Sequence, residues 1–466
     1  MATTVNVGTY VTNPANIPLT TTQIQQAHDA AGVNGKVIYP PVHYQINDVI
    51  KFYSGQTIVG DSVGGTIIEQ TDGTKPVLAS GNYYNASYGL SGRVRISHLT
   101  IWGVAGNLAN HGILLRDYYS TVEDVRLETL GGDGIHLVHL DSGGSAPAGN
   151  LIDNFFIDVM VLNAGGYCFY LGDQNNGKLT DGLMLNCYGS TNVSNNKSNI
   201  FIGSASGWLL EGIHTFGVSK DVALDIYNGF NTRLNDVYIE NFHNVGIRML
   251  QLQQQVTISN VTMFMEEVVQ DGMAFQFTKN SNWVNPRVLI NNVSLWQDLN
   301  TNRTIGIWSH NDSGVLIDVD NFVEEGSKRG NIIRSYMLEQ FCLTKPPMGN
   351  SVQFSGNTAQ TVNVQIPKLR SYSQAIGQIY ISASANYGST KRVEYVGMVM
   401  VTAKDNAVDP WSAILTTLTS FGLSVGVAVS AVKTGTGPGG VLQITFTPTS
   451  ADGYGLLSFN YLSSES

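Results

Sequence analysis

Glu128 and Asp158 are the residues whose type and spacing most directly suggest chemistry. Each follows one copy of a short repeated phrase, so we expect both to occupy equivalent outward positions on neighbouring coils of a repeating fold. Neighbouring strands lie about 4.8 Å apart, which would place the two carboxyl groups about 5 Å apart. That separation is typical of retaining glycosidases, whereas roughly 6.5–9.5 Å is typical of inverting ones. The sequence therefore predicts a carboxylate pair that cleaves glycosidic bonds.

A second set of carboxylates lies farther along the chain. Glu240 could pair with Glu266 or Glu267, which follow the next copy of the phrase. Polysaccharide binding also needs aromatic faces that stack on sugar rings and polar groups that bond the hydroxyls. We expect an outward strip of such side chains to position the sugar, and its members are Trp102, Arg126, His214, Tyr238 and Trp296.

Two other functions would use many of the same residues. In β-elimination from a uronic-acid polymer, a Tyr or His removes the C5 proton while an Arg neutralises the carboxylate. The residues that could serve are Arg126 with His214 and Tyr238, or His136 with Arg248. The same strip would also suit an adhesin that binds polysaccharide without cutting it. The histidines have no spacing suited to a metal site, so we expect neither a metal nor another cofactor.

The expected positions of these residues are derived from a short sequence motif, the repeated phrase named above, which recurs from about residue 96 to residue 310. It consists of a hydrophobic pair, an Asn or Asp, an alternating apolar run and a small-residue break. Period-2 strands and turn residues that return at such intervals indicate a solenoid. The predicted fold class is all-β, a right-handed parallel β-helix. Its Asn and Asp positions are expected to be turn residues that bond local backbone, and they are Asp124, Asn154, Asp236, Asn260 and Asn292.

Three regions are expected along the chain. Residues 1–19 form a polar N-terminal extension, and residues 20–345 form the β-helix, with a capping helix at 21–31 and regular rungs over about 96–325. The helix would cover the open end of the solenoid core. Residues 346–466 contain alternating runs separated by Gly, Pro and Asp turns, which predicts an antiparallel β-sandwich for trimerisation or carbohydrate binding.

Composition excludes several classes of partner. The net charge is −10, and no cluster of Lys and Arg is present to neutralise phosphates, which argues against nucleic acid. No apolar run approaches the ~20 residues of a membrane span, so no membrane insertion is expected. The N-terminus lacks the basic-then-apolar layout of a secretory signal peptide.

The N-terminal segment resembles that of the pectate-lyase-like parallel β-helix superfamily. The matching features are the helix residues Ile24, Ala27, Ala30 and Ala31, then Gly35-x-Val37, Pro40, Tyr44-x-Ile46 and Ser54-Gly55-Gln56-Thr57-Ile58-Val59-Gly60. The chain departs from the usual Pro-x-Gly-x-Tyr, because Val42 and His43 precede Tyr44. These features carry no catalytic residue, so the resemblance implies the fold and not a reaction.

A solenoid between a helical cap and a terminal β-domain resembles the bacteriophage tailspikes, in particular the capsular polysaccharide depolymerases. The resemblance implies a homotrimer in the tail or baseplate of a virion. It also implies an endo-glycosidase that hydrolyses capsular polysaccharide or lipopolysaccharide O-antigen outside the bacterial cell, after synthesis in the host cytoplasm. Tailspikes commonly begin with a virion-anchoring domain. We therefore expect either a very short anchoring segment before the cap or an anchor removed from this chain.

Overall fold

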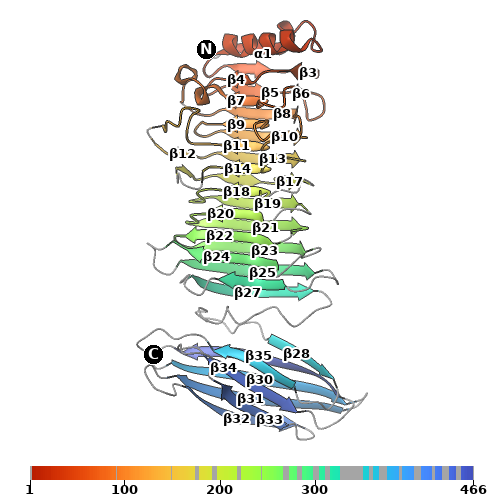
Figure 1. Cartoon of the computed structure of the whole chain (residues 1–466), viewed down its shortest axis with the longest axis vertical. Helices are drawn as coiled ribbons and strands as arrows, with labels where there is room; N and C mark the ends of the chain where they lie inside the picture. Colours follow the sequence, from red (N-terminus) through yellow and green to blue (C-terminus); the bar gives the residue numbers. More distant parts are fainter. Residues whose placement is uncertain are drawn as a thin grey trace. The chain divides into compact units, whose positions relative to one another are not determined.

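Successive coils of the chain stack along one axis and form two long parallel sheets (Figure 1). The computed structural model describes residues 3–265, apart from 91, 148, 174–177, 192–196, 218–221 and 243, and beyond them chiefly the strands. Each coil contributes strands to both sheets, so that residues far apart in sequence become neighbours. The predicted all-β class and the parallel β-helix are confirmed.

Sheet A pairs its strands from one coil to the next, and Val125 lies between Leu99 and Val159 in the register. Alternate side chains point inward and outward, as the period-2 pattern predicts. Its strands include β1 (Thr4–Asn6), β2 (Lys36–Ile38), β3 (His43–Ile46), β5 (Thr57–Val59), β6 (Ile67–Gln70), β8 (Arg95–Trp102), β10 (Thr121–Glu128), β13 (Phe155–Leu162), β16 (Leu183–Leu185), β17 (Tyr188–Ser190), β19 (Leu209–Phe216), β21 (Thr232–Glu240), β23 (Val256–Met265) and β25 (Arg287–Gln297).

Sheet B is built from mostly shorter strands on another side of the coil. Its strands include β4 (Ile50–Phe52), β7 (Leu78–Ser80), β9 (Ile113–Leu115), β11 (Ile135–Leu137), β14 (Phe169–Leu171), β18 (Ile200–Ile202), β20 (Val222–Tyr227), β22 (Val245–Leu252) and β24 (Gly272–Lys279). The chain before the C-terminal region also contains η1 (Val7–Thr9), η2 (Gly81–Tyr83), η3 (Ala86–Tyr88), β12 (Leu151–Ile152), β15 (Leu179–Thr180), β26 (Thr304–Ser309) and β27 (Leu316–Glu325).

The core between the sheets is a stack of apolar residues. Leu127, Val161, Ile239 and Met263 of sheet A are each fully buried, one per coil. Burying such a side chain contributes roughly 1.5–3 kcal/mol relative to leaving it exposed. The inward residues therefore hold neighbouring coils together.

Left-handed bends recur in sheet A at intervals of five residues. In one coil the residues with positive φ are Asp153, Asp158 and Asn163, at 54°, 52° and 56°. The equivalent residues of a later coil are Asn231, Asp236 and Asn241, at 51°, 54° and 56°. Asn and Asp tolerate this backbone region better than other residues with a Cβ atom. The middle bend folds each long strand of sheet A, so its two halves face different directions.

The N-terminal cap is the helix α1 (Ile17–Ala31), which lies at the end of the β-helix (Figure 1). Ile24, Ala27 and Ala31 form its buried stripe. The helix begins four residues before the predicted start at 21, because Pro18 lies in the first turn, where a missing N–H breaks no helical bond. It ends at Gly32, whose φ of 64° and N–H bond to the His28 carbonyl close the last turn.

The prediction of a separate extension at residues 1–19 was wrong. The strand β1 pairs in parallel with β2, and Val5 and Val7 are buried. Because these apolar side chains reach the core next to α1, residues from β1 onward belong to the β-helix itself.

The C-terminal region contains two antiparallel sheets, which agrees with the predicted β-sandwich. One has the order β28-β35-β30-β31-β32 and the other β29-β34-β33. The chain divides into two compact units, Met1–Gly306 with Val323–Ser327, and Ile307–Phe322 with Lys328–Ser466. The predicted boundary at 345 lies outside the described residues. The strands are β28 (Asn350–Ser355), β29 (Gln360–Ile366), β30 (Ala375–Tyr387), β31 (Lys391–Ala403), β32 (Trp411–Phe421), β33 (Gly426–Val432), β34 (Gly440–Thr447) and β35 (Gly453–Ser464).

Candidate functional site

The outward residues of sheet A after its middle bend form two adjacent columns, and one of them is rich in acidic and aromatic side chains. Strand register defines the columns, since residues paired in a parallel sheet stack at about 4.8 Å per coil. One column is Glu69, Trp102, Glu128, Leu162, Ser190, Phe216, Glu240, Phe264 and Trp296. Its neighbour is Ile67, Thr100, Arg126, Met160, Tyr188, His214, Tyr238, Thr262 and Ser294.

The predicted adjacency of Glu128 and Asp158 was wrong. Glu128 pairs with Leu162, four residues beyond Asp158. Asp158 lies instead at the middle bend, with φ 52°, and accepts a hydrogen bond from Asn186 Nδ2 at 3.2 Å. The error has a physical cause. The sequence phrase matches Asn154, beside the first bend, as well as it matches Asp158, which occupies the middle bend.

A different carboxylate shares the column with Glu128. Glu69 lies one strand beyond Trp102, so Trp102 stands between the two acids. Glu69 Oε2 accepts a hydrogen bond from Gln45 Nε2 at 2.8 Å and lies 2.8 Å from His43 Nε2. The Trp102 ring meets the His43 ring edge-on, with centroids 5.2 Å apart. Sequence reasoning missed Glu69 because it precedes the first clear copy of the repeated phrase.

Arg126 and Glu128 form an ion pair on one strand. The two residues occupy neighbouring columns, so the guanidinium flanks the column that holds the acids. Arg126 lies three strand spacings from His214, about 14 Å along the sheet. The expected set of Arg126 with His214 and Tyr238 is therefore not one catalytic group.

A second cluster occupies the later coils of sheet A. His214 Nε2 lies 3.3 Å from Glu240 Oε2, and its ring lies between those of Tyr188 and Tyr238, at 4.7 and 4.6 Å. Burial and the neighbouring charge of Glu240 raise the pKa of Tyr238. Tyr238 is 38% exposed and Trp296 45% exposed, so parts of both rings are open to a ligand. The predicted partners Glu266 and Glu267 lie outside the described residues.

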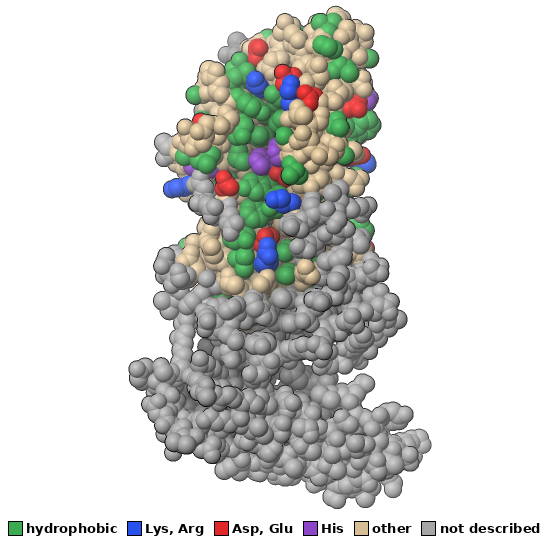
Figure 2. Space-filling model, viewed as in Figure 1, with side chains coloured by type: hydrophobic (Ala, Val, Ile, Leu, Met, Phe, Trp, Pro, Cys, Tyr) green, Lys and Arg blue, Asp and Glu red, His purple; other side chains and the backbone are tan. Residues whose placement is uncertain are grey.

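Sheet B also has an outward column, and its aromatic rings are stacked on one another. Hydrophobic side chains form a band down the middle of this face, with histidines in it and charged side chains farther along (Figure 2). His136, Tyr170 and Phe201 stack nearly parallel, with ring centroids 4.8 and 5.2 Å apart. Burial, more than the nearby Asp173, raises the pKa of Tyr170. Because each ring covers the face of the next, the stack presents ring edges to solvent. In full, the column is Ala79, Leu114, His136, Tyr170, Phe201, Asp225, Arg248 and Gln276.

His136 and Arg248 do not form the expected pair. They stand four strand spacings apart in this column, about 19 Å. Arg248 is instead bound to Asp225 by two hydrogen bonds, Nε to Oδ1 at 2.8 Å and Nη2 to Oδ2 at 2.5 Å. The Asp225 side chain is 8% exposed, so its carboxylate is largely withdrawn from water.

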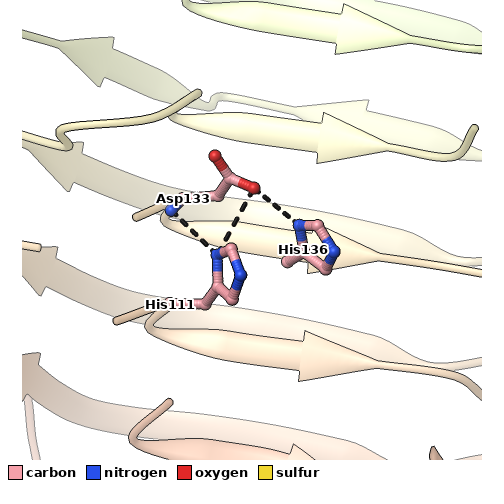
Figure 3. Close-up of side chains that lie close together, drawn as sticks. All are labelled: His111, Asp133 and His136. Carbon is pink, nitrogen blue, oxygen red and sulfur yellow. Dashed lines mark hydrogen bonds and ion pairs between the residues drawn. The ribbon is translucent and has the colours of Figure 1, made fainter. Parts of the chain in front are cut away.

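His136 belongs to a group that sequence spacing did not reveal. Asp133 Oδ2 lies 2.6 Å from His136 Nδ1 and 3.4 Å from His111 Nδ1, so one carboxyl oxygen contacts a nitrogen of each ring (Figure 3). The Asp133 backbone N–H donates to His111 Nδ1 at 3.0 Å, so His111 carries its proton on Nε2. Burial and the neighbouring His136 lower the pKa of His111 to about 4. Asp133 Oδ1 accepts the Tyr167 N–H at 2.7 Å, which fixes the carboxylate.

Among the described residues, no helix is long and apolar enough to cross a membrane.

Comparisons with known proteins give structural likenesses only. No protein-family model and no curated protein matches the chain. The chain is similar to the tailspike protein of Acinetobacter phage vB_ApiP_P1, at 12% identity over 99% of this chain and 88% of that chain, with TM-score 0.45. It is similar to the A-module of the mannuronan C-5 epimerase AlgE4 of Azotobacter vinelandii, at 15% identity over 73% and 100%, with TM-score 0.43. A tailspike of Acinetobacter baumannii bacteriophage Fri1, described as a capsular polysaccharide depolymerase, is 11% identical over 100% and 86%, with TM-score 0.37.

Proposed function

We propose that this chain binds a polysaccharide along the outer face of sheet A and hydrolyses it. One observation carries the proposal: Glu69, Trp102 and Glu128 share one outward column on three consecutive strands. Glycoside hydrolysis requires two carboxyl groups that act on opposite sides of one bond. An aromatic ring in the same column can hold the sugar by stacking while they act.

The separation of the two acids favours inversion of configuration. Two strand spacings are about 9.6 Å between the backbones, close to the upper end of the roughly 6.5–9.5 Å expected of inverting carboxyl groups. Glu128, beside Arg126, takes the proton from the attacking water. Glu69, which shares a hydrogen bond with His43 Nε2, gives a proton to the glycosidic oxygen as the bond breaks.

The later coils would bind more of the same polymer. Tyr238 and Trp296 expose ring surface on which sugars can stack, and His214 with Glu240 offers hydrogen-bonding groups. Glu240 lies four strand spacings from Glu128, about 19 Å, so it binds a different part of the polymer from the one that is cut. We assign Glu240 to this binding surface as a hydrogen-bonding residue.

The proposed substrate is a bacterial capsular polysaccharide or lipopolysaccharide O-antigen, and the proposed setting is a homotrimeric tailspike of a phage virion. The support is the resemblance of the helix–solenoid–β-domain layout to tailspikes, together with that of the cap segment to the pectate-lyase-like parallel β-helix superfamily. Light scattering of the purified chain should give the mass of a trimer. A monomer that remains active on polysaccharide would contradict the trimeric state and leave the site on one chain intact.

The test of hydrolysis uses a panel of capsular polysaccharides and measures polymer size and product chemistry. Glu69→Gln and Glu128→Gln should each slow depolymerisation about 100-fold or more, because each removes one acid–base group. The matched control is Glu123→Gln, on the same strand as Glu128 but before the bend and paired with Arg95 at 2.9 Å. It should retain full activity.

Product analysis separates the alternatives. New reducing ends of inverted anomeric configuration, without ultraviolet absorbance, support hydrolysis by this pair. Unsaturated products that absorb in the ultraviolet would mean β-elimination and would overturn the assignment. Binding of a polysaccharide with no loss of size would make the chain an adhesin.

A further inference from the structure

Three side chains with metal-binding atoms meet on two neighbouring coils beside sheet B. His111 and Asp133 each stand two residues before a strand of sheet B, β9 and β11, and His136 is the middle residue of β11. Their candidate ligand atoms all lie within 4.8 Å of one another. Over the part of the chain that the structure describes, no other group of three or more His, Cys, Asp or Glu residues meets this condition.

We propose that His111, Asp133 and His136 bind one divalent transition-metal ion of the zinc type. Zinc lies about 2.0–2.2 Å from His nitrogens and carboxylate oxygens in a tetrahedral arrangement, which separates two ligand atoms by about 3.3 Å. Asp133 Oδ2 is 2.6 Å from His136 Nδ1 and 3.4 Å from His111 Nδ1, so both separations from the carboxylate lie near that value. Two imidazoles favour zinc, cobalt or nickel over calcium and magnesium, which prefer oxygen ligands.

The site is sheltered, unlike the other His–carboxylate contacts among the described residues. The side chains of His111, Asp133 and His136 are 16%, 9% and 20% exposed. His98 and Asp124, which lie 2.8 Å apart on sheet A, are 46% and 48% exposed and have a single imidazole. Water competes less for a sheltered ion, and a third protein ligand holds it against exchange. Figure 3 shows one Asp133 carboxyl oxygen facing a nitrogen of each ring, where it can reach an ion bound to both.

Asp133 is oriented by a contact that ion binding leaves in place. Its Oδ1 accepts the Tyr167 N–H at 2.7 Å, and Oδ2 points toward the histidines. Partners of this kind fix the direction of a metal ligand and strengthen binding. The fourth ligand would be water, since three protein ligands leave one tetrahedral position open.

Binding has a defined cost. The ion replaces the proton on His136 Nδ1, which leaves to solvent. His111 Nδ1 must exchange its hydrogen bond from the Asp133 N–H for the ion. The two rings, which stack at 4.1 Å with an interplanar angle of 23°, must also open so that both lone pairs point at one ion. We therefore expect a dissociation constant in the micromolar range, about 1–100 μM.

The experiment is titration of the full chain with Co²⁺, followed by its visible absorbance, and competition by Zn²⁺. One ion per chain should bind. Asp133→Asn and His136→Gln should each weaken binding about tenfold or more. His98→Gln, in the exposed pair, is the matched control and should bind as the unaltered chain does.

Two results would overturn the proposal. One is the absence of saturable Co²⁺ or Zn²⁺ binding up to about 1 mM. The other is binding that survives both Asp133→Asn and His136→Gln, which would place the ion elsewhere. Asp133→Asn keeps an oxygen for the Tyr167 N–H, and circular dichroism should report unchanged strand content. If that variant does not fold, His136→Gln decides the outcome.

Discussion

The two sheets of the β-helix use aromatic residues on their outer faces in opposite ways. On sheet A the His214 ring meets Tyr188 at an interplanar angle of 78° and Tyr238 at 34°. On sheet B the rings of Tyr170 and Phe201 lie 9° from parallel. Tilted rings leave ring surface open, whereas parallel rings cover one another.

The difference teaches that an aromatic column is not by itself a sugar-binding surface. Sheet B uses its rings to join coils, and its Asp225–Arg248 pair does the same with charge. Sheet A leaves Tyr238 and Trp296 exposed and gains little stability from them. Mutations on the outer face of sheet B should therefore lower stability, whereas mutations on the outer face of sheet A should weaken ligand binding.

The largest contrast is expected between Phe201 and Tyr238. Phe201→Ala should lower the free energy of unfolding by about 3–4 kcal/mol, because a ring that is 5% exposed leaves a cavity between its neighbours. Tyr238→Ala should change it by about 0.5 kcal/mol while weakening polysaccharide binding up to about tenfold. Chemical denaturation and a binding titration on both variants would measure the contrast. Equal losses of stability would remove the distinction between the faces.

Ion pairs provide a second contrast. Arg248→Met should cost about 3 kcal/mol, because it leaves the buried Asp225 carboxylate without its main partner. Arg95→Met, which breaks the Arg95–Glu123 pair on sheet A, should cost less than about 1 kcal/mol, because those side chains are 57% and 33% exposed. High salt should weaken the second pair and hardly affect the first. A salt-sensitive Arg248 contribution would contradict the assignment.

Acid should separate buried from exposed histidines. Burial lowers the pKa of His28 from 6.5 to about 4, although Gln56 and Asp29 oppose the shift. The unfolded chain then binds the proton more tightly, so stability is fully present above about pH 6.5 and declines toward pH 4. Between pH 7 and pH 4.5, His28 should account for a loss of about 2.5 kcal/mol. His28→Gln should flatten this slope and the exposed His98→Gln should not, when denaturation is repeated across pH.

The smallest effect is expected at Asp158. Asp158→Asn keeps a residue that tolerates the left-handed bend and keeps an acceptor for Asn186. Stability should change by less than about 0.5 kcal/mol, and depolymerisation should continue at its full rate. A large loss of activity would instead indicate that Asp158 is catalytic. It would contradict the assignment of Asp158 to a purely structural position at the middle bend.

Much of the fold follows from the sequence, because period-2 apolar runs and turn residues specify a solenoid directly. The inward stack, the cap helix and the outward positions of Glu128, His214, Glu240 and Trp296 in sheet A could be derived this way. Register could not be derived on every coil. Positive-φ residues recur every five positions, so matching Asp124 to Asn154 rather than Asp158 shifts one strand by four residues.

The three-residue group beside sheet B shows another limit. His111 and Asp133 are 22 residues apart, so no local spacing rule unites them. The sequence nevertheless contains a signal, because His111 and Asp133 each come directly before a Gly-Ile pair. The pairs are Gly112-Ile113 and Gly134-Ile135. Superposing those pairs places His111 over Asp133, with His136 next to both. The Asp133 N–H bond and the tautomer of His111 could be seen only once the coils were assembled.

The five-residue recurrence of left-handed bends has a consequence for how such a chain can change. The bends and the inward stack determine the path of the backbone, and neither involves the outward column of sheet A. Under the proposed function, exchanging Trp102, Phe216 or Trp296 would therefore alter which sugar is bound while the coil keeps its shape. Specificity would then change one column position at a time, with no change in the fold.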